Sequence, residues 1–171
     1  MKLMVIDGNS ILNRAFYGIR PLTTREGFYT HAIYGFLSTM KRLTDEEQPD
    51  ALCVTFDRRE PTFRHLEFPD YKGQRKGMPE ELAMQLPVMK DVLDAMNIPR
   101  YELAGYEADD LIGTISRKCE AADWDCVIVH CGALSPSTMY CTSSTPESER
   151  IERDSDSRIG ARCESSMDCM T

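Results

Sequence analysis

Acidic residues follow two apolar runs of this chain, an arrangement suited to binding a divalent cation. Asp7 ends the run Lys2-Leu3-Met4-Val5-Ile6, and Asp57 ends the run Val54-Thr55-Phe56. A carboxylate at the end of a buried strand can line a crevice, and carboxylate oxygens suit a hard ion such as Mg²⁺. Ordinary alternatives exist, because Asp7 can instead cap the following helix and Asp57 can form a turn.

A third acidic group, Glu107-Ala108-Asp109-Asp110, opens a helical stretch. Acids at a helix start interact favourably with the helix dipole, so the group can be explained without a metal. Carboxylates this close also repel one another, and a bound cation relieves that repulsion. Glu107 and Asp110 share one helical face, whereas Asp109 is expected to point elsewhere. The three segments together predict a metal site whose candidate ligands are Asp7, Asp57, Glu107, Asp109 and Asp110.

Residues 58–76 form a basic stretch with aromatic residues, holding six Lys or Arg against three acids. Such a stretch can hold phosphate groups, although a solvated loop is the plain alternative. Arg14 follows the first acidic site by two helical turns and can face either the same crevice or the solvent. The candidate nucleic-acid contacts are therefore Arg14, Arg64, Lys72, Arg75 and Lys76.

Alternating strands and helices must position these residues. The apolar patterns predict strands at residues 2–6, 50–56 and 126–129, and helices at 30–43, from Pro79 onward, and at 107–121. Pro87 is expected to kink or divide its helix, since an interior proline costs ~3 kcal/mol. Such β-α-β units form a parallel sheet in an α/β domain. Sites in these sheets lie beyond the carboxyl ends of the strands, where Asp7 and Asp57 stand.

In this order and spacing, the motifs resemble the 5′-nuclease domain of bacterial DNA polymerase I, in the flap endonuclease family. Each motif is weak alone, but six in order are specific. They span residues 2 to about 129 and comprise Val5–Ser10 with Asn13–Tyr17, Ala32–Phe36, Val54–Asp57, Pro61–His65, Tyr71–Arg75 and Gly105–Asp110.

The resemblance implies a PIN-like (resolvase-like) α/β fold, a parallel sheet flanked by helices, over residues 1–130. It implies two Mg²⁺ or Mn²⁺ ions held by carboxylates, with the five acids above as metal-site residues. It places Lys72 and Arg75 at the scissile phosphate and Arg14 near the DNA. The implied reaction is phosphodiester hydrolysis at a 5′ flap, nick or free 5′ end of DNA during replication and repair. Metal-assisted hydrolysis requires no protein nucleophile.

The resemblance stops after Val129. The family continues with a Thr-Gly-Asp-x-Asp-like turn whose aspartates hold the second metal, whereas here His130-Cys131-Gly132 follows. Residues 131–171 contain nine serines, against three in residues 1–130, and we expect a disordered tail outside the family domain. Asp154 and Asp156 lie in this tail and receive no role.

We therefore expect a fold that is incomplete at its C-terminus, an incomplete second metal site and weakened cleavage. A change of reading frame near residue 130 is our hypothesis for the altered composition. The coding DNA tests it, because the alternative frame must restore a Gly-Asp-x-Asp motif and hydrophobic periodicity.

The composition adds weaker constraints. The net charge is −8, but the five candidate ligands account for the acidic excess of residues 1–130, which hold 16 Lys and Arg against 21 Asp and Glu. A bound metal would offset much of that charge. The seven cysteines form no CxxC pair, which argues against a structural zinc site. Without a secretory signal or a membrane-length apolar run, we expect a cytoplasmic protein with no membrane partner.

Two other functions stay open at this point. One is a non-catalytic DNA-binding remnant that uses only the basic stretch. The other is a PIN-type ribonuclease, which would share the fold and the carboxylates. The Tyr71-Lys72-x-x-Arg75 and Tyr106–Asp110 motifs favour DNA over RNA.

Overall fold

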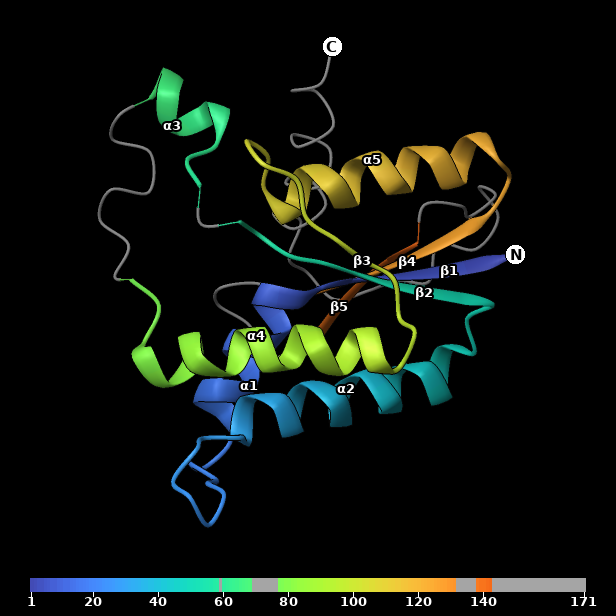
Figure 1. Ribbon diagram of the computed structural model, residues 1–171. Coiled ribbons are helices and arrows are strands. Elements are labelled where there is room, and N and C mark those ends of the chain that lie inside the picture. The colour runs from blue at the N-terminus through green and yellow to red at the C-terminus, as the bar shows by residue number, and fades with distance from the viewer. Residues whose placement is uncertain (59, 69–76, 132–137, 143–171) are drawn as a thin grey trace, which may run out of the picture.

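The computed structural model describes residues 1–58, 60–68, 77–131 and 138–142, which form a sheet with helices on both faces (Figure 1). The sheet has five strands in the spatial order β3-β2-β1-β4-β5. They are β1 (Lys2–Asp7), β2 (Ala51–Thr55), β3 (Arg100–Tyr101), β4 (Asp125–Cys131) and β5 (Thr138–Thr142). Strands β1 to β4 are parallel, and β5 is antiparallel to β4. The predicted parallel α/β fold is confirmed.

The helices divide the core into two layers. Helices α1 (Gly8–Gly18), α2 (His31–Glu47) and α4 (Glu80–Ala95) cover one face of the sheet, and α5 (Ala108–Ala121) covers the other. Successive residues of β1 point to opposite faces. Met4 and Ile6 pack in the layer of α1, α2 and α4, whereas Val5 packs against α5. The short α3 (Phe63–Glu67) lies beyond the sheet.

The strands and helices that the sequence patterns predict lie close to the expected positions. The predicted division of a helix at Pro87 is wrong, while a kink there stays a prediction. Pro87 lies inside α4, which runs undivided from Glu80 to Ala95. A proline removes one backbone hydrogen bond of the helix. Buried side chains on both sides of Pro87, among them Leu82 and Leu93, anchor α4 to the core. This packing holds the two halves of the helix in one element.

The strand β5 is a second difference. We expect a disordered tail over residues 131–171, yet β4 continues to Cys131 and Thr138–Thr142 pairs with it. Thr138-Met139-Tyr140-Cys141-Thr142 carries β-branched and aromatic residues that suit a strand. Pairing also satisfies the backbone groups of β4 that would otherwise form an open edge. The rest of the predicted tail, with Asp154 and Asp156, lies outside the described residues.

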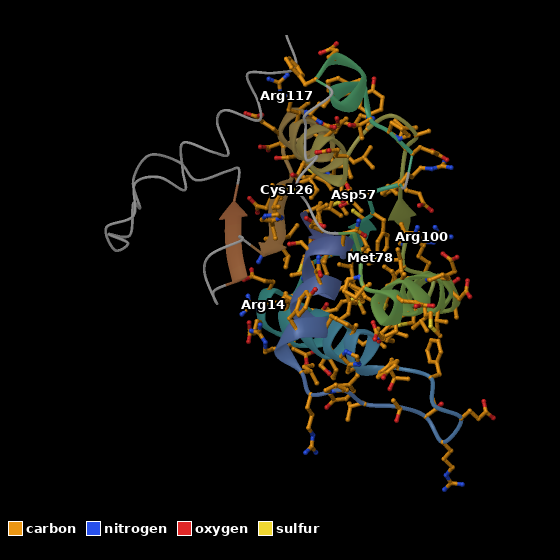
Figure 2. The ribbon with its side chains drawn as sticks, turned by 90° about the vertical axis from the view of Figure 1, so that its left-hand side faces the viewer. Arg14, Asp57, Met78, Arg100, Arg117 and Cys126 are labelled. Atoms are coloured by element: carbon orange, nitrogen blue, oxygen red, sulfur yellow. The ribbon has the colours of Figure 1, made fainter. Side chains whose placement is uncertain are left out.

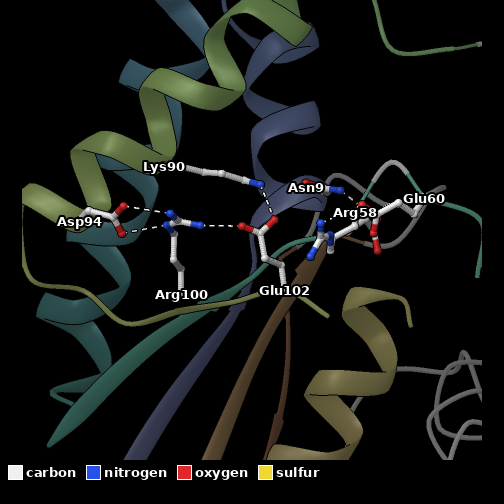
Figure 3. A network of polar contacts seen from close by, with 8 residues as sticks. Asn9, Arg58, Glu60, Lys90, Asp94, Arg100 and Glu102 are labelled. Atoms are coloured by element: carbon white, nitrogen blue, oxygen red, sulfur yellow. Dashed lines mark hydrogen bonds and ion pairs between the residues drawn. The ribbon is translucent and has the colours of Figure 1, made fainter. Parts of the chain in front are cut away.

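A chain of ion pairs connects α4 to the segment around β3 (Figure 3). Lys90 Nζ lies 2.6 Å from one oxygen of Glu102, and an Arg100 guanidinium nitrogen lies 2.6 Å from the other. The far side of the Arg100 guanidinium meets Asp94 at 2.8 Å and 2.9 Å. Partly exposed pairs contribute little energy individually. Together they fix the segment that leads from the short strand β3 to Glu107.

Cysteines occupy the layer between the sheet and α5. Cys53 and Cys126 are buried there beside Cys119, as the apolar runs around them predict. Burial, followed by the nearby Cys119, raises the pKa of Cys53 and of Cys126 to about 12. These two thiols therefore stay neutral and act as small core side chains. Within the described ranges, no helix is both long and apolar enough to span a bilayer.

Candidate metal centre

Asp7 stands where β1 meets α1. It is the last residue of the strand, only 6% exposed, and its Oδ1 accepts a hydrogen bond of 3.0 Å from the Ser10 backbone N–H. The carboxylate therefore caps α1, which is the alternative to metal binding that the sequence allows for Asp7. Its other oxygen, Oδ2, lies toward His130. Gly8 follows because a Cβ there would lie 2.4 Å from the Phe56 ring. Close packing of Phe56 against Gly8 thus fixes the backbone beside Asp7.

Asp57 links three segments at the same edge of the sheet. Its Oδ1 accepts a 2.7 Å hydrogen bond from the Ala108 N–H, at the first turn of α5. Its Oδ2 accepts a 2.9 Å hydrogen bond from Asn9 Nδ2 in α1. Asp57 follows β2, so its side chain connects the end of that strand to the first turns of α1 and α5. Both of its oxygens are engaged in this positioning.

Glu107 and Asp110 form the capped start of α5. Their side chains make a capping box, in which each accepts from the other's backbone N–H. Arg64, from α3, reaches Asp110 with two hydrogen bonds of 2.7 Å and 2.6 Å, and its guanidinium lies 3.7 Å from Glu107. Asp110 is buried at 3% exposure, so this guanidinium offsets charge that would otherwise be costly there. In the structure Arg64 is engaged with these two carboxylates, and its contact with nucleic acid stays a prediction.

Asp109 meets Asp7 and His130. One potential ligand atom from each of these three residues lies within 4.8 Å of the other two. His130 Nδ1 and Asp7 Oδ2 are 2.9 Å apart. Asp7 is buried and His130 is half-buried. Asp109 is exposed as a whole residue, but the Asp109 carboxylate turns inward to this cluster. A regular first turn is expected to direct Asp109 elsewhere, yet Asp109 reaches Asp7 and His130. Successive helical residues are about 100° apart, so Asp110 points toward Arg64 instead.

The electrostatics of this cluster favour a positive charge. Desolvation by packing around the carboxyl group, followed by the negative charge of Asp7, raises the pKa of Asp109. The hydrogen bond with Asp7 raises the pKa of His130, against the opposing effect of burial. Thus the carboxylate is harder to ionise and the imidazole is easier to protonate. The negative charge of Asp7 contributes to both shifts, although desolvation is the larger cause of the shift of Asp109.

The donor set fits a divalent cation. Carboxylate oxygens and an imidazole nitrogen bind such ions at about 2.0–2.2 Å, so ligands on opposite sides of one ion lie up to about 4.3 Å apart. Small side-chain rotations bring atoms within 4.8 Å of one another to that spacing. Asp7 and Asp109 are thus gathered at one point, together with a histidine that the sequence analysis did not select. Asp57, Glu107 and Asp110 make hydrogen bonds around this point, and their role as metal ligands stays a prediction.

The remaining candidates lie farther away or outside the described residues. Arg14 is seven residues beyond Asp7, about 10 Å along the axis of α1. It is a half-buried residue of that helix and lies apart from Asp57 (Figure 2). Lys72, Arg75 and Lys76 fall outside the described ranges. Parallel pairing could have identified His130, since Ile6 pairs with Val129 and the next residues are Asp7 and His130.

Known proteins resemble this chain over most of its length. A family model described as the 5′-3′ exonuclease, N-terminal resolvase-like domain, matches residues 2–131. DNA polymerase I of Caldicellulosiruptor bescii is 43% identical over 129 residues, covering 75% of this chain and 15% of that protein. The 5′-3′ exonuclease of Aquifex aeolicus is 44% identical over 116 residues, covering 68% of this chain and 40% of that protein. This chain therefore spans a minor part of each relative.

Solved structures share the fold. A structure of T5 5′-exonuclease with divalent zinc ions bound superposes with a TM-score of 0.52 at 23% identity, covering 71% of this chain and 45% of that one. The T5 D15 protein co-crystallised with metal ions gives a TM-score of 0.51 at 19% identity, covering 75% of this chain and 54% of that one. At such identities the likeness shows the fold alone.

Proposed function

This chain belongs to the 5′-3′ exonuclease family through its N-terminal resolvase-like domain, as its motifs predict, and from that premise we propose that it is a divalent-metal-dependent nuclease acting on DNA near a 5′ end. One observation carries the proposal: Asp7 and Asp109, from different elements, converge at the carboxyl edge of the parallel sheet. Crevices at this edge are the usual sites of such sheets.

The acidic residues at the carboxyl edge of the sheet have different roles in this proposal. Asp7 and Asp109 hold the cation, Mg²⁺ or Mn²⁺, through carboxylate oxygens. Asp57 positions the start of α5 by accepting from the Ala108 N–H, and the Glu107 and Asp110 pair keeps that first turn closed. When bound, a divalent cation supplies an activated water and neutralises charge on the leaving oxygen. Asp57, Glu107 and Asp110, which the motifs assign to the metal, also orient Asp109 in this way.

The proposed contact with DNA is based on the positive charge of residues 58–76. We propose that Lys72, Arg75 and Lys76 contact backbone phosphates, since the stretch they share carries a basic excess. A positive side chain near the scissile phosphate stabilises charge that grows in the transition state. Arg14 would meet the DNA farther from the cut, because it lies about two turns along α1 from Asp7. The substrate class is DNA with a 5′ flap, a nick or a free 5′ end.

We also propose that the family domain is residues 1–130 and that the second metal site is incomplete. The family match ends at residue 131, and His130-Cys131-Gly132 stands where the resemblance leads us to expect two further aspartates. One cation instead of two gives less stabilisation of the leaving oxygen. Cleavage should therefore be slower than that of a relative with both sites.

A cleavage assay with a matched variant tests the proposal. The full chain is incubated with 5′-flap DNA or single-stranded RNA, in Mg²⁺ or Mn²⁺ and in chelator. Asp109→Asn should reduce flap cleavage at least about 100-fold, since metal binding contributes several kcal/mol to the transition state. Asp91→Asn, which removes the same charge from an exposed position on α4, should leave the rate unchanged.

Other outcomes separate the alternatives. Metal-dependent cutting of RNA alone would support a PIN-type ribonuclease. Flap binding without cutting in any metal would support a DNA-binding remnant. Cleavage that persists in chelator or in Asp109→Asn would refute the role given to this cluster.

A further inference from the structure

His130 sits in the cluster at a position where the resemblance leads us to expect no nitrogen ligand. It lies near the carboxyl end of β4, the strand that pairs with β1 so that Ile6 faces Val129. This register places the imidazole beside Asp7, where the side-chain exposures are 39% for His130 and 8% for Asp7. The contact therefore follows from the sheet itself.

The distances suit a shared ion as well as a hydrogen bond. Two adjacent ligands of an octahedral ion with bonds of about 2.1 Å lie about 3.0 Å apart. His130 Nδ1 and Asp7 Oδ2 are already 2.9 Å apart. One carboxylate oxygen of Asp109 lies within 4.8 Å of a ligand atom of Asp7 and of a ligand atom of His130, inside the range that a small rotation can close. Three elements thus present one ligand each to a single point.

A nitrogen ligand changes which ion the site prefers. Carboxylates and water suit Mg²⁺, whereas imidazole nitrogen binds first-row transition metals more strongly. We propose that His130 is a direct metal ligand with Asp7 and Asp109, so that this chain takes a transition-metal ion such as Mn²⁺ or Zn²⁺ in preference to Mg²⁺. The inference rests on the proposed function for the site, and it adds a ligand and a selectivity to it. Ligation requires the neutral imidazole, so binding releases any proton held there.

A purely structural role is the competing explanation. Histidines often hold a ligating carboxylate through a hydrogen bond without touching the metal. His130→Gln separates the two, because a glutamine amide can still donate to Asp7 but has no imidazole nitrogen. His65→Gln is the matched control, since it removes another of the three histidines from the chain.

Mn²⁺ alone is the probe, bound to the full chain. Pulsed electron paramagnetic resonance should show ¹⁴N coupling typical of an imidazole ligand in the native chain and in His65→Gln. The coupling should disappear in His130→Gln, and Mn²⁺ affinity should fall by about 10-fold or more. Mg²⁺ affinity, measured by competition, should fall much less. Thermal melting of each variant without metal shows whether it has kept its fold.

Three results would overturn the inference. Two of them are a native chain without imidazole coupling to bound Mn²⁺ and coupling that persists in His130→Gln. Equal losses of Mn²⁺ and Mg²⁺ affinity would assign His130 to positioning Asp7. These readouts need no cleavage. A chain that shows coupling but cuts no nucleic acid would refute the nuclease proposal alone, whereas flap cleavage without coupling would refute the histidine ligand alone.

Discussion

Two pairs of carboxylates meet at the start of α5, and each pair has a different kind of cationic partner. Glu107 and Asp110 face Arg64, a permanent cation that binds Asp110 with two hydrogen bonds. Asp7 and Asp109 face His130, whose charge depends on pH. Asp109 and Asp110 are neighbours in sequence, yet the helix turns them toward different partners. The difference separates acids that pair with a permanent cation from acids that we propose to bind an exchangeable ion.

The largest effect is expected from removing the permanent cation. Arg64→Met should lower the free energy of unfolding by about 3 kcal/mol, because Asp110 loses the charge that offsets its burial. We take the lower end of the range for broken buried pairs, since the Arg64 side chain is itself 23% exposed. Urea unfolding in chelator, followed by circular dichroism, measures the loss.

Arg58→Met is the matched control, because Arg58 pairs with Glu60 where the side chains are 42% and 51% exposed. Its loss should stay below about 1 kcal/mol. A double variant with Asp110→Asn should recover part of the Arg64→Met loss, since the charge left without its guanidinium is then absent. Similar losses for Arg58→Met and Arg64→Met would remove the distinction between the two carboxylate pairs.

Much of the frame could be predicted from the sequence, because it depends on local patterns. Apolar runs that end in an acid located Asp7 and Asp57 at the carboxyl ends of strands, and both lie there. The acids before an apolar helical stretch located the start of α5. These features depend on neighbours within a few residues, which periodicity and capping describe.

The partners of the acids could not be predicted in this way, because they come from distant segments. Arg64 and Asp110 are 46 residues apart, and His130 and Asp7 are 123 apart. Which acid of the α5 start faces inward depends on where the helix begins. That start is held by Asp57, through its bond to the Ala108 N–H. Such long-range contacts leave no periodic trace in the sequence.

A smaller effect should follow from neutralising the acid next to Asp110. Without metal at neutral pH, Asp109→Asn should stabilise the fold. The gain should be less than about 1 kcal/mol, because the residue as a whole is exposed although its carboxylate turns inward. The pKa of Asp109 is raised by desolvation and by Asp7, so the folded state holds this proton more tightly. The stability that the bound proton contributes is therefore lost as the pH rises above 3.8, the ordinary pKa of an aspartate.

Unfolding of the native chain and Asp109→Asn, each in chelator, should consequently diverge between pH 4 and neutrality. Asp91→Asn, on the exposed surface of α4, should follow the native curve. Destabilisation by Asp109→Asn would mean that this carboxylate belongs to the structural frame, together with Asp110.

The smallest effect concerns the charge of His130. The hydrogen bond with Asp7 raises the pKa of His130 above its ordinary 6.5, so the protonated imidazole is favoured in the folded state. This stabilisation is complete below pH 6.5 and is lost as pH rises through the higher folded value. In chelator, the native chain should lose less than about 1 kcal/mol over this window, because His130 is 39% exposed. His130→Gln should lose less unfolding free energy over the same window. Saturating Mn²⁺ should make the stability of the native chain rise with pH, since the ion competes with the proton. A native chain that instead gains stability over this window in chelator would show that His130 is not a pH-dependent counterpart of Arg64.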